Sequence, residues 1–162
     1  DLRGNVDTRL GKLDKGEFDA IVLAAAGVIR HGLSERITEY IPHPLLLPAV
    51  GQGAIGIECR TNDSVIQELI FPLNDVETSI CISAERAFSR RLQGGCQLPI
   101  AAHASIEGKE IKLKGLVARL DGSEIIQSEQ KGDVGNIEHV GKLLAESLLK
   151  QGADVILEEL IK

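Results

Sequence analysis

Apolar and polar positions alternate most regularly in the second half of the chain. From residue 75 to 92 the apolar side chains recur at the spacing of one helix face, and Asp75 or Thr78 supplies the cap. Three segments with the two-residue period of strands follow, separated by glycine-containing turns, and two helical segments close the chain. The predicted elements are strands at 100–106, 110–119 and 123–130 and helices at 136–151 and 153–160. This half therefore predicts an α+β domain with a three-stranded antiparallel sheet packed on helices.

The first 70 residues show a less complete pattern. Apolar residues at helical spacing predict an opening helix that Asn5 or Asp7 caps and Gly16 ends. A continuous apolar run then predicts a strand buried on both faces, which Gly27 ends, and prolines and glycines mark residues 42–53 as a connector. The predicted elements are a helix at 6–13, strands at 19–25 and 55–59, an amphipathic segment at 28–40 and a short helix at 64–70. The two strands have α/β character but no full sheet to join.

Composition excludes several classes of protein. The chain of 162 residues is 43% hydrophobic and 26% charged, which is typical of a folded domain rather than a disordered one. A net charge of −6 and only 2% aromatic residues argue against nucleic-acid binding, which requires basic surfaces or aromatic stacking platforms. No apolar stretch reaches the length of a membrane span, and no signal sequence is visible. We therefore expect a soluble, cytoplasmic protein that binds neither nucleic acid nor membranes.

The N-terminus, the cysteines and the histidines add three expectations. The chain opens on Asp1 without an initiator methionine, which indicates a sequence that begins within a longer protein. Its 3 cysteines are widely spaced and form no C-x-x-C pair, which predicts reduced thiols. The 4 histidines are scattered as well, so no metal site is expected.

A glycine-rich loop follows the connector. Residues 51–56 fit the G-x-G-x-x-G pattern of dinucleotide-binding sites. Such a site requires a strand before the glycines and a helix after them, whereas here prolines precede them and β-favouring residues follow. The favoured interpretation is a hinge in which two backbone segments approach closely.

A second glycine loop carries a thiol. Cys96 follows Gly94-Gly95, just beyond the predicted long helix, and glycine permits backbone conformations that are closed to other residues. Arginines at 86, 90 and 91 on the last turns of that helix would favour the reactive thiolate. A nucleophile and an inert cysteine in a turn both fit this position.

Three arginines form another candidate site. Arg3 precedes the first helix, Arg9 lies within it, and Arg30 follows the apolar run. Strand ends and helix starts line ligand crevices in α/β layouts, and the guanidinium fork suits carboxylates. The arrangement predicts a carboxylate-binding site, with an ordinary surface arginine as the alternative for each residue alone.

Five segments match one family together. They are Arg-Gly-Asn-Val-Asp-Thr-Arg-Leu at 3–10, Asp-Ala-Ile-Val-Leu-Ala-Ala-Ala-Gly at 19–27, the segment 47–60, Ala-Glu-Arg-Ala-Phe at 84–88 and Gly-Gly-Cys-Gln-Leu-Pro-Ile-Ala-Ala at 94–102. In this order, over essentially the whole chain, they resemble the porphobilinogen deaminase (hydroxymethylbilane synthase) family. Two small departures exist: Gln93 stands where the family often has Glu, and Leu98 replaces a common Val.

The resemblance implies a function. The family is a transferase of tetrapyrrole biosynthesis, the route to porphyrins and heme, and it condenses four porphobilinogen molecules into hydroxymethylbilane with release of ammonia. It extends a dipyrromethane cofactor that is held through a thioether on a cysteine, which matches Cys96. Porphobilinogen and the growing polypyrrole chain carry acetate and propionate groups, which the family binds with arginines. By the same resemblance the cofactor-binding residues are Cys96, covalently, and Arg3, Asn5, Arg9, Arg30, Gln52 and Gly53.

The resemblance also implies an incomplete enzyme. Residues 1–50 would form the C-terminal part of domain 2, an α/β domain like the periplasmic binding proteins. Residues 51–74 would form the hinge and the return to domain 1, and residues 75–162 would form domain 3. The N-terminal half, which carries the family's catalytic aspartate, is the missing partner, so no catalytic residue is assigned here. We expect the chain alone to be inactive.

Two other classes of function stay open from the residues alone. The arginines would also suit a stand-alone module that binds small carboxylates without catalysis. Cys96 would also suit an unrelated cysteine-dependent enzyme, with the thiol as its nucleophile. The intact mass of the chain tests the family resemblance, because a dipyrromethane on Cys96 adds a discrete increment. An unmodified Cys96 leaves both the enzyme fragment and the carboxylate-binding module open.

Overall fold

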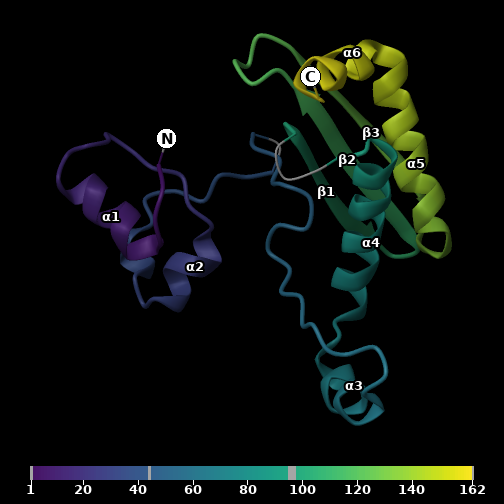
Figure 1. Cartoon of the computed structure of the whole chain (residues 1–162), viewed down its shortest axis with the longest axis horizontal. Helices are drawn as coiled ribbons and strands as arrows, with labels where there is room; N and C mark the ends of the chain where they lie inside the picture. The colour runs from purple at the N-terminus through teal and green to yellow at the C-terminus, as the bar shows by residue number, and fades with distance from the viewer. Residues whose placement is uncertain (1, 44, 95–97, 162) are drawn as a thin grey trace. The chain divides into compact units, whose positions relative to one another are not determined.

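A computed structural model describes residues 2–43, 45–94 and 98–161 of the chain (Figure 1). The chain divides into two compact units, Asp1–Pro42 and His43–Lys162. The second unit is the larger one and contains the β-sheet. None of the helices in the described ranges is both long and apolar enough to cross a membrane.

The larger unit is an α+β domain. Its three strands form one antiparallel sheet in the order β1-β2-β3, as the two-residue alternation predicts. The helices and strands predicted for residues 64–160 are confirmed, with shifts of a few residues at their ends. Their bounds are α3 Ser64–Ile70, α4 Val76–Arg91, β1 Ile100–Glu107, β2 Glu110–Ala118, β3 Ile125–Asp133, α5 Ile137–Leu148 and α6 Asp154–Ile161.

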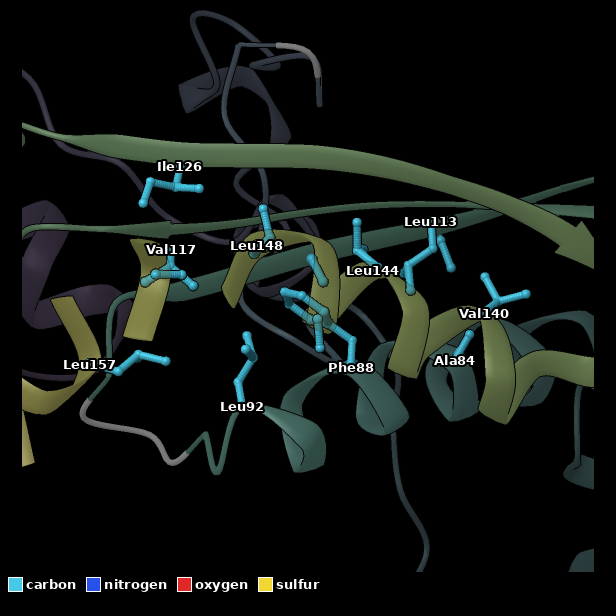
Figure 2. Packing of buried hydrophobic residues seen from close by; sticks show 14 of the residues in the cluster. Ala84, Phe88, Leu92, Leu113, Val117, Ile126, Val140, Leu144, Leu148 and Leu157 are labelled. Atoms are coloured by element: carbon cyan, nitrogen blue, oxygen red, sulfur yellow. The ribbon is translucent and has the colours of Figure 1, made fainter. Parts of the chain in front are cut away.

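The core lies between the sheet and the helices α4 and α5. On β2, Leu113 and Val117 are fully buried while their neighbours are partly exposed, which is the alternation of a sheet covered on one face. These side chains cluster with Phe88 of α4 and with Leu144 and Leu148 of α5 (Figure 2). Phe88 is the largest of the fully buried side chains, and aliphatic residues fill most of the remaining core.

The two covering helices approach closely at Gly141 of α5. A Cβ atom at this position would lie 2.6 Å from the Ala87 Cβ and 2.7 Å from the Ala84 carbonyl oxygen. Both distances are shorter than van der Waals contact, so the absence of a side chain sets the spacing of the helices. At the other end of α5, Gly152 has a φ of 101° and ends the regular helix before α6.

The smaller unit contains α1 (Val6–Asp14), α2 (Ala25–Arg30) and a 3₁₀ turn at Ser34–Arg36. The opening helix is confirmed, but the strand predicted at 19–25 is wrong. Residues 20–24 form neither helix nor strand, and Gly27 lies inside α2 instead of before it. A strand requires a hydrogen-bonded neighbour, and the described residues of this unit supply none.

The strand predicted at 55–59 is also not formed in this chain. Its residues pair with no strand that the structure describes, and Ile55 and Ile57 are 84% and 55% exposed. The alternating pattern identifies side chains that suit a sheet, but no strand among the described residues pairs with them.

Candidate functional site

The segment Arg3–Arg9 folds around the first turn of α1. Asn5 caps the helix, because its Oδ1 accepts a 2.8 Å hydrogen bond from the Thr8 N–H. Arg9 Nε donates a 2.7 Å bond to the Gly4 carbonyl oxygen. Gly4 has a φ of 121°, and a Cβ on it would lie 2.7 Å from Thr8 Cγ2, so the turn requires glycine. Local hydrogen bonds therefore hold Arg9 beside the N-terminus of α1.

The end of α2 lies against the start of α1. His31 directly follows Arg30, and its Nδ1 is 3.7 Å from Asp7 Oδ1 in the first turn of α1. The backbone of Arg30 is thereby brought to the same end of α1 that carries Arg3 and Arg9. Guanidinium groups and a helix N-terminus both favour anions, so this end of the smaller unit suits a carboxylate ligand.

Gln52 and Gly53 lie in a tight turn of the larger unit, which we call the glycine turn (residues 49–54). The Gln52 N–H donates a 2.9 Å hydrogen bond to the Ala49 carbonyl oxygen. Gly51 and Gly53 have φ values of 76° and 90°, which favour glycine. No helix follows them, since residues 54–60 form neither helix nor strand, so the dinucleotide interpretation has no structural support.

A buried carboxylate holds the glycine turn to the sheet. Glu85 of α4 is 4% exposed, and its Oε2 accepts a 2.8 Å hydrogen bond from the Gly51 N–H. Its Oε1 accepts a 2.9 Å bond from the Ala104 N–H of β1. Burial raises the pKa of the Glu85 carboxyl, while the two backbone donors and His43 act in the opposite direction. One side chain therefore joins α4, β1 and the turn that carries Gln52.

Sequence patterns alone do not single out Glu85. It stands on the apolar face of α4, four residues after Cys81 and three before Phe88. A carboxylate on such a face is unusual and requires hydrogen-bond partners. That placement is a signal in the sequence that could have drawn attention to this residue.

The expected cofactor cysteine, Cys96, lies outside the described residues. The described residues on both sides of it are anchored. The Gly94 N–H donates a 2.8 Å bond to the Ser89 carbonyl oxygen near the end of α4, and Leu98 packs against the hydrophobic core. A Cβ on Gly94 would lie 2.6 Å from Ser89 Oγ, which explains the glycine at this position.

The three arginines on α4 that were expected to act on the thiol have different neighbours. Arg90 forms an ion pair with Glu138 of α5, and Arg91 Nε lies 3.5 Å from Glu146 Oε1. These pairs offset part of the positive charge expected near the thiol. Arg86 instead lines a cavity of about 770 Å³, to which the glycine turn also contributes.

The other two cysteines, Cys59 and Cys81, are partly buried. Burial raises the pKa of the Cys81 thiol, and the charge of Glu85 adds to that effect, so the reactive thiolate is disfavoured there. Within the described ranges, no group of three or more histidine, cysteine or acidic side chains is placed to hold a metal ion.

Comparison with known proteins gives two matches to one family along the chain. Residues 1–68 match the model of the porphobilinogen deaminase dipyromethane cofactor binding domain, and residues 79–150 match that of the porphobilinogen deaminase C-terminal domain. A porphobilinogen deaminase from Pelobacter propionicus is 51% identical over 158 residues, which are 98% of this chain and 51% of that protein. The chain therefore spans about half the length of this curated relative. It belongs to the porphobilinogen deaminase family.

Proposed function

We propose that this chain is the cofactor-bearing part of an enzyme that condenses four porphobilinogen molecules into hydroxymethylbilane and releases ammonia. In this proposal the primer is a dipyrromethane attached to Cys96. The observation that carries the proposal is the 51% identity to a porphobilinogen deaminase over 98% of the chain. The match of residues 1–68 to a dipyrromethane-binding domain supports the choice of cofactor.

The residues at the start of α1 support the choice of ligand. Porphobilinogen and dipyrromethane carry carboxylates on each ring, and guanidinium groups bind carboxylates through paired, charge-assisted hydrogen bonds. Arg9 uses Nε to hold Gly4, so its two terminal nitrogens are the donors for a ligand. We assign Arg3, Arg9 and Arg30 to ligand carboxylates and Asn5 to a further polar contact.

The described residues on both sides of Cys96 support its role as the attachment point. A thioether forms through the thiolate, which is the nucleophilic state of cysteine. When bound, the dipyrromethane supplies the pyrrole carbon to which the first substrate ring adds. The protein contributes position, because the Ser89–Gly94 hydrogen bond fixes the chain before Cys96 and the packing of Leu98 fixes the chain after it.

The partner that we assign to this chain is the N-terminal half of the enzyme. We assign residues 1–50 to a domain like the periplasmic binding proteins, residues 51–74 to a hinge and a return to domain 1, and residues 75–162 to domain 3. Apolar side chains are exposed in residues 51–74, which supports a surface there that packs against the N-terminal half of the enzyme. They are Ile55, Ile57, Val65, Ile66, Leu69, Phe71 and Leu73. The partner would supply the strands that segments 20–24 and 55–59 lack.

Co-expression with the N-terminal half of the Pelobacter propionicus relative tests the proposal. We expect the complex to consume porphobilinogen, and this chain to gain the mass of a dipyrromethane and to colour with Ehrlich's reagent. Cys96→Ser removes the mass increment and the activity, whereas Cys81→Ala, the matched control, keeps both. An increment that survives in Cys96→Ser, or turnover by the chain alone, contradicts the proposal. Binding of porphobilinogen with neither increment nor turnover would favour a carboxylate-binding module.

A further inference from the structure

A strap of residues 45–53 runs along the outer edge of β1. The Ala102 N–H of β1 donates a 3.1 Å hydrogen bond to the Pro48 carbonyl oxygen, and one antiparallel bridge pairs the strap with the strand. Glu85 accepts from the Ala104 N–H, two residues further along the same edge. The strap and one carboxylate therefore occupy the outward N–H groups of Ala102 and Ala104 on this edge of the sheet.

Two histidines stack where the strap begins. The ring centroids of His43 and His103 lie 3.8 Å apart, with 28° between the ring planes. His43 is the first residue of the larger unit. His103 lies on β1 between the buried Ala102 and Ala104, so its side chain is on the face of the sheet away from the helices. The stack thus joins the start of the strap to the open face of the sheet.

Charged groups of both signs surround the histidine pair. Lys114 of β2 lies directly opposite His103, and its Nζ is 3.6 Å from Glu129 Oε2 of β3. Burial, followed by the charges of His43 and Lys114, lowers the pKa of His103. Glu85 of α4 is the acidic group that interacts with His43. Two imidazolium rings at the observed spacing repel each other, so the stack requires at least one neutral ring.

We propose that the His43–His103 stack is a pH-sensitive latch, which holds the strap on β1 near neutral pH and releases its N-terminal end when both rings are protonated. Release removes the support next to the Pro48–Ala102 hydrogen bond, so this bond opens with the stack. Glu85 continues to hold the far end of the strap at Gly51. When the latch is closed, the linker between the two units ends at His43. In acid this linker therefore extends toward Gly51, which Glu85 still holds.

Amide hydrogen exchange at Ala102 in the full 162-residue chain tests the latch. The rate is measured by NMR from about pH 7.5 to about pH 5.5 and corrected for intrinsic exchange, which gives the fraction of open molecules. We expect this fraction to rise as the pH falls, by up to about tenfold per pH unit for each proton that opening binds. An open fraction that does not change over this range overturns the latch.

His43→Tyr is the deciding variant, because it keeps an aromatic ring for stacking but carries no charge in this range. It is expected to keep the Ala102 amide protected and to remove the pH dependence. His139→Gln, at an exposed position of α5, is the matched control and keeps the wild-type pH dependence. The same pH dependence in His43→Tyr as in the wild type would show that another group opens the strap.

An NMR titration of the His103 ring decides the question independently of any variant. A midpoint below the ordinary histidine value supports the latch, because the closed stack then resists protonation. A midpoint at or above that value overturns it, since the closed stack would then hold its proton as well as an isolated histidine does.

Discussion

The carboxylate of Glu85 accepts a 2.8 Å hydrogen bond from the Gly51 N–H, across 34 positions of sequence. The other oxygen of the same carboxylate is bonded to β1, so a helix, a strand and a turn meet at one buried group. Both donors are backbone N–H groups, which cannot rotate toward another acceptor as a side chain can. The stability of the glycine turn therefore depends on this side chain.

Replacement of Glu85 tests that dependence. We expect Glu85→Ala to lower the free energy of unfolding by about 2–6 kcal/mol, because two backbone donors lose their acceptor at about 1–3 kcal/mol each. Glu85→Gln keeps the shape and one acceptor oxygen, so its loss is smaller. Urea denaturation measures both variants. Glu77→Gln in the exposed first turn of α4 is the control, and a loss no larger than that of the control would contradict the anchoring role.

The raised pKa of Glu85 predicts the direction of a pH effect. The folded state binds this proton more tightly than the unfolded state, because burial disfavours the ionised carboxylate. The stabilisation is fully present below the ordinary value of 4.5 and is lost as the pH rises through the raised value. We expect the free energy of unfolding of the wild type, minus that of Glu85→Gln, to grow as the pH is lowered through this window. Urea titrations at several pH values measure the difference, and a constant difference would contradict the assignment.

The close approach of α4 and α5 predicts opposite effects for two glycine-to-alanine changes. Gly141→Ala places a Cβ against the backbone of α4, so we expect a loss of about 1–3 kcal/mol in spite of the higher helix propensity of alanine. Gly11→Ala in α1 meets nothing within 4 Å and should gain about 0.5–1 kcal/mol. Thermal unfolding followed by circular dichroism compares the two. Equal effects would show that the spacing of the helices is not limited by Gly141.

The assignment of Arg30 to ligand carboxylates predicts a change in substrate binding. In the enzyme reconstituted with the N-terminal half, Arg30→Ala should raise the KM for porphobilinogen by about 10–100-fold, because one charge-assisted interaction contributes about 1.5–3 kcal/mol. Arg36→Ala is the control in the same unit, since Arg36 pairs with Asp14 instead. Steady-state kinetics give both values. A KM that responds equally to the two changes would remove Arg30 from the ligand site.

Residues 64–160 of the larger unit could be predicted almost completely from the sequence, because this segment contains the partners of its own elements. The alternation predicted a strand at 110–119, and the structure buries Leu113 and Val117 on one face of β2. The caps were equally local: Asp75 accepts a 2.8 Å hydrogen bond from the Thr78 N–H at the start of α4. Signals that act over a few residues were sufficient here.

The two strands that were predicted but are not formed show what local sequence patterns cannot predict. Residues 19–25 and 55–59 have the composition of strands, but a strand exists only where another strand pairs with it. Periodicity reports which side chains suit a sheet and contains no information on what supplies the neighbouring strand. Val22 is accordingly 64% exposed in a run that was predicted to be buried on both faces.

In the candidate site, too, the features set by local sequence were predicted and those set by long-range contacts were not. The spacing of the arginines around the first helix predicted a shared location, and the structure brings Arg30 to the end of α1 that carries Arg9. Glu85 and the histidine stack were not predicted, because both join residues far apart in sequence. The role of Cys96 stays a prediction, since it rests on the family resemblance.

β1 and β3 are the two edges of the sheet, and an edge strand offers its backbone groups to other molecules. The strap and Glu85 occupy the edge of β1, while charged residues such as Glu129 and Lys131 are spaced along β3. A change that loosens the strap would leave the Ala102 N–H ready to pair with a strand from a second molecule. When the strap is loosened, we therefore expect this domain to aggregate through added strands while its core is still folded.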